Sequence, residues 1–140
     1  MSQVENLSHQ EALQKVRKLA ADKVAMFTTF SSLYSTESRP MYTQGIDDDG
    51  TFWFFSKSSS NKNAQIANHA SVHLMYSNSG SDAYLSVKGK GAIVEEESTI
   101  DRLWSDFAKV WFEEGRQDPS LTLIRVTPEQ FHYWDPEHGR

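Results

Sequence analysis

Apolar residues near the start of the chain recur at the spacing of one helical face. Ser8 followed by Glu11 forms a capping box, a pattern that begins helices by satisfying free backbone N–H groups. The sequence therefore predicts an amphipathic helix over residues 8 to 22 that covers a sheet. Its apolar face consists of Ala12, Leu13, Val16, Leu19 and Ala20.

After this helix, short runs of β-branched and aromatic residues are separated by turn residues. The acidic run 47–50, which ends in glycine, predicts that segments 41–46 and 51–56 pair as a hairpin. Gly89 and Gly91 indicate a bend or bulge inside a long strand. The predicted strands are 24–30, 41–46, 51–56, 72–76, 83–94, 121–126 and 131–134.

Two further helices are predicted. The run Ser58-Ser59-Ser60-Asn61-Lys62 ends a strand and caps a short helix over residues 62–68. A late helix is expected from residue 98 to about 112, before Asp118-Pro119 breaks the chain. Its helically spaced apolar residues are Ile100, Leu103, Trp104, Phe107, Val110 and Trp111.

These elements predict the fold class. Six or seven strands with short turns and about three helices favour a mainly β protein, a closed or half-open antiparallel barrel with peripheral helices. The βαβα alternation of a doubly wound sheet and a Gly-rich phosphate loop are both missing from the sequence. We expect a single domain over residues 1–140, a usual length for one hydrophobic core.

Composition narrows the function classes. The net charge of −5 argues against a nucleic-acid or anionic-membrane binder, so any bound phosphate needs a local cluster of cations. The absence of cysteine excludes disulfides, thiolate chemistry and Cys-ligated metals. The N-terminal residues lack the pattern of a signal peptide, and no apolar run is long enough for a membrane span. A cytoplasmic location is expected.

Arg39 and Lys62 are candidate phosphate ligands. The predicted hairpin places Arg39 and Ser56 near one end, where the turn 58–62 begins a helix with free N–H groups. An arginine fork, a lysine and serine hydroxyls at a helix N-terminus suit a phosphate. The alternative is that both cations are solvated and the serines only cap the helix.

An aromatic run occupies the second arm of this hairpin. Phe52, Trp53, Phe54 and Phe55 cannot all face a single core, because successive strand residues point to opposite sides. One side is therefore expected to meet another body, either a partner subunit or a flat ligand.

One set of residues extends over nearly the whole chain, from the first helix to Tyr133-Trp134-Asp135. It comprises Arg39-Pro40-Met41-x-Thr43-Gln44, Asp48-x-Gly50-x-x-Trp53-Phe54-Phe55-Ser56, Lys62, Ile66, Tyr84-x-Ser86-Val87-x-Gly89 and Trp104 with Trp111-Phe112. This set resembles the general stress protein 26 group of the pyridoxamine 5′-phosphate oxidase-related flavoproteins, which have the FMN-binding split-barrel fold.

The resemblance implies a homodimer with FMN at the subunit interface. Arg39 and Lys62 would hold the phosphate, with the serine hydroxyls in support, and Gln44 would reach the polar edge of the flavin. Trp104 and Trp111 are candidates for covering the ring from the second subunit, with packing onto the barrel as the alternative. The implied cofactor residues are Arg39, Pro40, Met41, Thr43, Gln44, Phe54, Phe55, Ser56, Ser59, Ser60, Lys62, Trp104 and Trp111.

Departures from the family pattern limit the expected activity. The C-terminal residues lack the Arg-x-His pair of true pyridoxamine-phosphate oxidases, Gln44 stands where those enzymes carry a lysine, and Asn61-Lys62 replaces an Arg-Lys pair. Vitamin B6 oxidation is therefore not expected. The interpretation is an FMN-dependent oxidoreductase of unknown substrate with NAD(P)H as a candidate donor. The alternative is a non-catalytic flavin storage or sensing module, and FAD or a deazaflavin ranks behind FMN.

A metal site is not expected. His69 and His73 are four residues apart, but the strand predicted over 72–76 does not give them the shared face of a helix. The acidic run 47–49 precedes Gly50 and is better explained as a turn.

Overall fold

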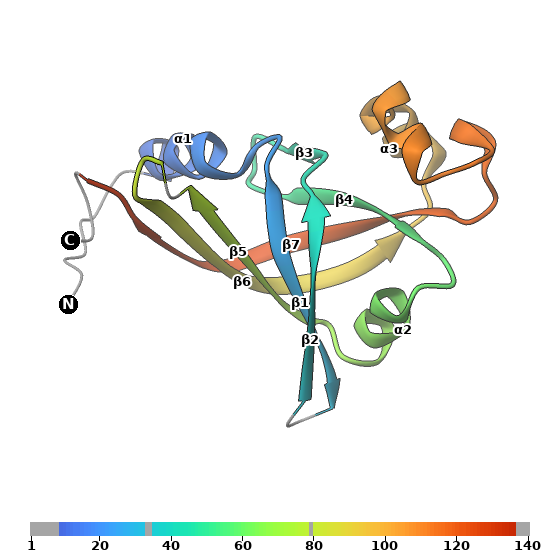
Figure 1. Cartoon of the computed structure of the whole chain (residues 1–140), viewed down its shortest axis with the longest axis horizontal. Coiled ribbons are helices and arrows are strands. Elements are labelled where there is room, and N and C mark those ends of the chain that lie inside the picture. Colours follow the sequence, from blue (N-terminus) through green and yellow to red (C-terminus); the bar gives the residue numbers. More distant parts are fainter. Residues whose placement is uncertain (1–8, 33–34, 79, 137–140) are drawn as a thin grey trace.

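A computed structural model describes residues 9–32, 35–78 and 80–136 (Figure 1). Ser8 of the capping box and Ser79, between the predicted strands 72–76 and 83–94, lie outside the described residues. The described part contains one seven-stranded antiparallel sheet, in the order β2-β1-β5-β6-β7-β4-β3. The strands are β1 (Val24–Ser32), β2 (Ser35–Tyr42), β3 (Gly45–Ile46), β4 (Phe52–Lys57), β5 (Ser71–Asn78), β6 (Ala83–Val94) and β7 (Leu121–Trp134).

The predicted hairpin of segments 41–46 and 51–56 is largely wrong. Arg39 and Met41 belong to β2, which pairs with β1, and only β3 pairs with β4. The chain changes partner at Thr43, whose N–H donates to Lys23 O at 2.9 Å, while the next N–H, of Gln44, donates to Trp53 O at 2.8 Å. The two edges of the sheet are thus joined by two residues, which curls the sheet into a half-open barrel.

The last two predicted strands form one continuous strand, β7. They stay together because β6 pairs with β7 along its length, with a register shift between Lys88 and Gly89. The shift confirms the bulge predicted from the glycines. A Cβ at Gly89 would lie 2.4 Å from Thr127 O. The two strands therefore approach so closely there that only glycine fits.

The helices lie around the sheet (Figure 1). α1 (His9–Ala20) buries Val16 in the barrel core, as the helical pattern predicts. α2 (Asn61–Asn68) begins after Ser60, whose side chain accepts the Asn63 N–H, so the predicted serine cap is confirmed. α3 (Glu97–Leu103) is the third α-helix in the described residues.

The predicted late helix is wrong beyond Leu103. The backbone is extended at Trp104, and 3₁₀ turns follow at Asp106–Val110 and Gly115–Gln117. Its aromatic residues pack in two different places, and a single straight helix could not reach both. Trp104 packs against Phe55 and Phe112, whereas Phe107 packs against Tyr42 and Trp111.

The aromatic strand β4 divides its side chains between two hydrophobic clusters. Phe52 and Phe54 lie in the barrel core with Phe27, and Trp53 and Phe55 lie on the other side, against α3 and the segment that follows it. All four are at most 7 % exposed. The expectation that one side meets a partner or a ligand stays a prediction, because the chain itself buries all four rings while Phe55 also lines the cavity described below.

Candidate functional site

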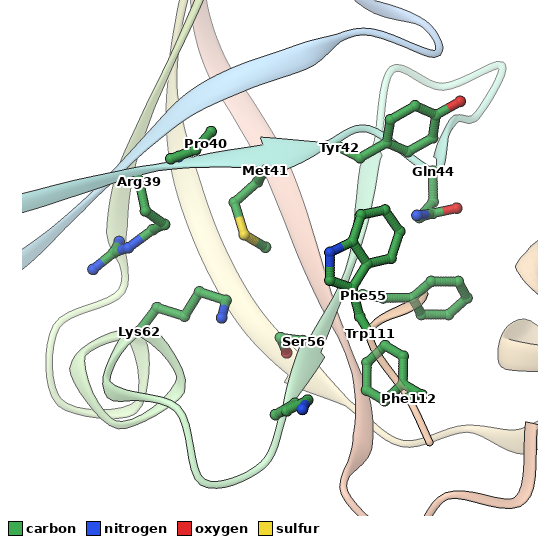
Figure 2. Close-up of a pocket in the computed structure, with 11 residues that line it drawn as sticks. Arg39, Pro40, Met41, Tyr42, Gln44, Phe55, Ser56, Lys62, Trp111 and Phe112 are labelled. Carbon is green, nitrogen blue, oxygen red and sulfur yellow. The ribbon is translucent and has the colours of Figure 1, made fainter. Parts of the chain in front are cut away.

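A cavity of about 300 Å³ opens at the split of the barrel, between β2 and β4. Figure 2 shows cationic side chains at one end, aromatic side chains at the other, and Met41 between them. The lining residues are Arg39, Pro40, Met41, Tyr42, Gln44, Phe55, Ser56, Lys57, Lys62, Trp111 and Phe112.

A second hollow of about 430 Å³ adjoins the cationic end and shares Arg39 and Lys62 with the first. Its other walls are Glu37 and Ser38 of β2 and Ser60 and Asn61 at the start of α2. The two cations thus stand at the boundary between an aromatic compartment and an open polar one. A ligand with a flat body and an anionic group could occupy both.

Positive charge accumulates at this boundary. The pKa of Lys62 is lowered, first by burial and then by the neighbouring charges of Arg39 and Lys57. Among the described residues no carboxylate forms an ion pair with Lys62 or Lys57. Glu37 lies 3.7 Å from Nη2 of Arg39, and the pKa of Asp118 is lowered by hydrogen bonds from Ser120, to which the charge of Lys57 adds. The end of the cavity is therefore short of negative charge, which an anionic ligand would supply.

Arg39 is held by its neighbours. Burial lowers the pKa of its guanidinium, against the opposing effect of Glu37. Nη1 donates to Thr29 Oγ1 at 2.8 Å and to Phe27 O at 3.3 Å. Because β2 pairs Arg39 directly with Phe27, the guanidinium folds over β1 toward the mouth of the barrel.

The serines have unequal roles. Ser60 caps α2 and lines the polar hollow beside Arg39 and Lys62. Ser56 lines the cavity but is buried, and its hydroxyl bonds to that of Thr122 at 2.7 Å. Thr122 already donates its hydrogen to Ser56 O, so Ser56 must donate to Thr122 and can offer a ligand only an acceptor. Ser59 lines neither hollow.

The aromatic end combines buried and exposed rings. Phe55 and Phe112 are buried against each other, with ring centroids 6.2 Å apart. Trp111 is 44 % exposed and packs edge-on against Phe107. Gln44 contributes an amide at this end (Figure 2). A planar ring with one polar edge would meet aromatic surface and an amide here.

The structure brings most of the predicted cofactor residues together, although not through the predicted hairpin. Arg39, Pro40, Met41, Gln44, Phe55, Ser56, Lys62 and Trp111 line the cavity, and Ser60 lines the adjoining hollow. Four do not line either hollow. Phe54 is in the barrel core, Thr43 is buried with its hydroxyl 2.7 Å from Tyr76 Oη, Ser59 is exposed, and Trp104 packs under Phe55.

Sequence reasoning missed Tyr42, Lys57 and Phe112 as cavity residues. Lys57 could have been found, because it stands between Ser56 and the serine run that was already assigned to a phosphate. Tyr42 gave no separate signal, because its place depends on the crossing at Thr43. Phe112 belonged to the residue set that resembles the family but was not assigned to the cofactor.

The histidines and the acidic run have contacts of their own. No cluster of three or more metal-ligating side chains occurs within the residues that the structure describes. His73 bonds to Ser86 at 2.7 Å, and His69 stacks on Phe30. Asp47 and Gly50 close a hairpin turn, as predicted. None of the described helices is long and apolar enough to cross a membrane.

Comparison with solved structures supports the fold. The general stress protein 26 of Bacillus anthracis matches with a TM-score of 0.77 at 20 % identity, over 88 % of this chain and 93 % of that one. A protein from Clostridium acetobutylicum, described as related to general stress protein 26, matches with a TM-score of 0.75 at 19 % identity, over 93 % and 89 %. At these identities the likeness shows the fold, a split barrel.

A third solved structure is more similar in sequence. It is described as a general stress FMN/FAD binding protein from Xanthomonas citri, and it matches with a TM-score of 0.75 at 26 % identity over 89 % of each chain. Comparison with curated proteins gave no match. The family model described as pyridoxamine 5′-phosphate oxidase like matches residues 11–140, and the chain therefore belongs to this family.

Proposed function

We propose that this chain is a flavoprotein that binds FMN in the cavity at the barrel split and acts as an oxidoreductase on an unidentified substrate. One observation carries the proposal, the cavity that joins a cluster of three cations to a set of aromatic walls. The described residues fit the cofactor, because FMN also joins a phosphate dianion to a planar ring. The Xanthomonas relative, described as FMN/FAD binding, supports the same reading.

The phosphate would lie between Arg39 and Lys62, facing the start of α2. There it would meet a guanidinium fork, an ammonium group and the positive end of an eight-residue helix. The dianion would also offset the repulsion from Arg39 and Lys57, which adds to burial in lowering the pKa of Lys62. Each charged contact should contribute about 1.5–3 kcal/mol to binding.

The ring would lie beyond Met41, toward Phe55 and Trp111, with Gln44 at its polar edge. Bound FMN would supply hydride and single-electron chemistry. The chain's own residues would orient the ring and keep water from one of its faces, since Phe55 is buried while Trp111 remains partly open to solvent. We do not propose vitamin B6 oxidation, because Gln44 and Asn61 stand where such oxidases carry cations.

We propose a homodimer as the active assembly. With both sides of β4 covered within the chain, the support comes from the outer face of β1, β5 and β6 instead. Val24, Met26, Met75 and Tyr84 are each at least 38 % exposed there, and Met26 lies directly opposite Met75. A second copy would remove this apolar surface from water. Sedimentation of the purified chain at the mass of a monomer at all concentrations would refute the dimer.

The first experiment is a titration of the purified protein with FMN, FAD and riboflavin, followed by flavin fluorescence. Binding in the order FMN before riboflavin is expected, because riboflavin lacks the phosphate. If none of the flavins binds, the proposal fails. NAD(P)H oxidation by the FMN-loaded protein then separates an enzyme from the storage or sensing alternative, which predicts bound flavin without turnover.

A further inference from the structure

We propose that Thr29 and Gln65 are positioning residues, which hold the Arg39 guanidinium in the orientation that binds a phosphate. Neither side chain lines the cavity or the polar hollow. Gln65 Oε1 accepts hydrogen bonds from Thr29 Oγ1 and from Nη2 of Arg39, the latter at 3.4 Å. Thr29 Oγ1 in turn accepts from Nη1 of Arg39 at 2.8 Å. The inference rests on the proposed flavin phosphate site.

The direction of each hydrogen bond among Thr29, Gln65 and Arg39 is fixed by chemistry. A guanidinium can only donate, and a glutamine Oε1 can only accept. The Thr29 hydroxyl must therefore accept from Arg39 and donate to Gln65, which uses its single hydrogen. Thr29 is fully buried, so each of these groups would cost free energy if it lost its partner. These hydrogen bonds can form together in one arrangement only, and that arrangement selects one orientation of the Arg39 guanidinium.

This orientation leaves a particular edge of the guanidinium open. Both hydrogens of Nη1 are used, on Thr29 Oγ1 and on Phe27 O, and one hydrogen of Nη2 is used on Gln65. Among the described residues none accepts from Nε. Glu37 is the nearest carboxylate, at 3.7 Å from Nη2. Within the described part of the chain, the Nε hydrogen and the second hydrogen of Nη2 have no hydrogen-bond acceptor, and together they form the fork that binds two phosphate oxygens at once.

Three elements meet in this network. Thr29 comes from β1, Arg39 from β2 and Gln65 from α2, where it lies one turn after Lys62. Positions three apart share one side of a helix, so α2 presents Lys62 to the ligand and Gln65 to Arg39 together. The helix thereby sets the distance between the two phosphate ligands. Without it, Arg39 could rotate toward Glu37 and solvent.

The test uses FMN and riboflavin as probes of the full-length chain. Thr29→Val removes the hydroxyl at nearly constant volume, and Gln65→Met removes the acceptor at nearly constant length. Thr29→Ser, the matched control, keeps the hydroxyl. In the first two variants the dissociation constant for FMN should rise about 3- to 10-fold. The constant for riboflavin should change by less than about twofold, because its contacts do not include Arg39. Thr29→Ser should bind FMN as the wild type does.

The ratio of the two constants decides the question, because a general loss of structure would weaken both ligands equally. If the wild type prefers FMN and both variants keep that preference, the positioning role is refuted and the phosphate site stands. If the wild type shows no preference for FMN, the phosphate site itself is refuted, and the positioning role with it. Should Thr29→Val fail to fold, Gln65→Met decides alone, since Gln65 is only half-buried at the surface of α2.

Discussion

Replacing Lys62 by methionine should weaken FMN binding and stabilise the ligand-free protein. Methionine keeps an unbranched apolar stem and is a good helix former, so α2 should persist. The variant loses one charged contact to the phosphate, which is worth about 1.5–3 kcal/mol. The dissociation constant for FMN should therefore rise about 10- to 100-fold, while that for riboflavin should hardly change.

The stability effect follows from the direction of the pKa shift. Burial, then Arg39 and Lys57, lower the pKa of Lys62, so the folded state disfavours its charged form. This penalty is full below the folded pKa and vanishes above the ordinary value of 10.5. At pH 7 Lys62→Met should thus raise the melting temperature of the ligand-free chain, and the gain should disappear as the pH passes that ordinary value.

The assay pairs flavin fluorescence titration with thermal denaturation. Lys90→Met is the matched control, because Lys90 is an exposed residue of β6 that lines neither hollow and carries the same charge. The control should bind FMN as the wild type does. Two results would refute the reasoning, namely equal FMN affinity in Lys62→Met and Lys90→Met, or a loss of riboflavin affinity as large as that of FMN.

Four further predictions test other parts of the molecule. Glu37→Gln removes the carboxylate 3.7 Å from Nη2 of Arg39, so FMN should bind about two- to fivefold tighter in titrations, and unchanged binding would show that the pair is irrelevant. Trp111→Ala should weaken FMN and riboflavin equally, about 3- to 10-fold, with little change in melting temperature because the ring is 44 % exposed; a selective loss of FMN would contradict this. Gly89→Ala places a Cβ 2.4 Å from Thr127 O and should cost about 2–4 kcal/mol in urea denaturation, whereas a neutral effect would mean that β6 and β7 can separate. FMN affinity should fall below about pH 6, because the phosphate gains a proton there. It should fall again in alkali, where Lys62 loses its charge, since burial and the neighbouring cations lower the pKa of Lys62. An acid loss of the same size for riboflavin would argue against phosphate binding.

Local chemistry made much of the fold predictable. The helical face of α1 and the serine cap of α2 depend on neighbours within one turn, and both are confirmed. β6 has the predicted bounds, because side-chain alternation marks its course and turn residues mark its start. Gly89 also signalled its irregularity, since a close approach of two strands requires that residue. Each of these features can be read within a few residues.

Which strands pair with one another could not be predicted from such local patterns. The turn at Asp47–Gly50 suggested that the whole segment 41–46 pairs with β4, yet the chain changes partner at Thr43. Thr43 itself is buried, with its hydroxyl bonded to that of Tyr76 on β5, a residue 33 positions away. The residue at which the partner changes thus bonds to a strand far away in the sequence, and no local pattern marks the change.

Most of the predicted site residues nevertheless lie around one cavity, for a different physical reason. In the predicted hairpin Arg39 would reach Ser56 across one ladder, whereas in the structure it reaches the same place across the open split of the barrel. The split leaves a gap between β2 and β4 that backbone pairing would otherwise close. Burial, and after it the neighbouring cations Arg39 and Lys57, lower the pKa of Lys62, so the folded state disfavours its charge, and a bound anion would offset that cost. The same positive charges thus raise the affinity for an anion and lower the stability of the ligand-free fold. Residues that lower this stability therefore indicate where the candidate site lies.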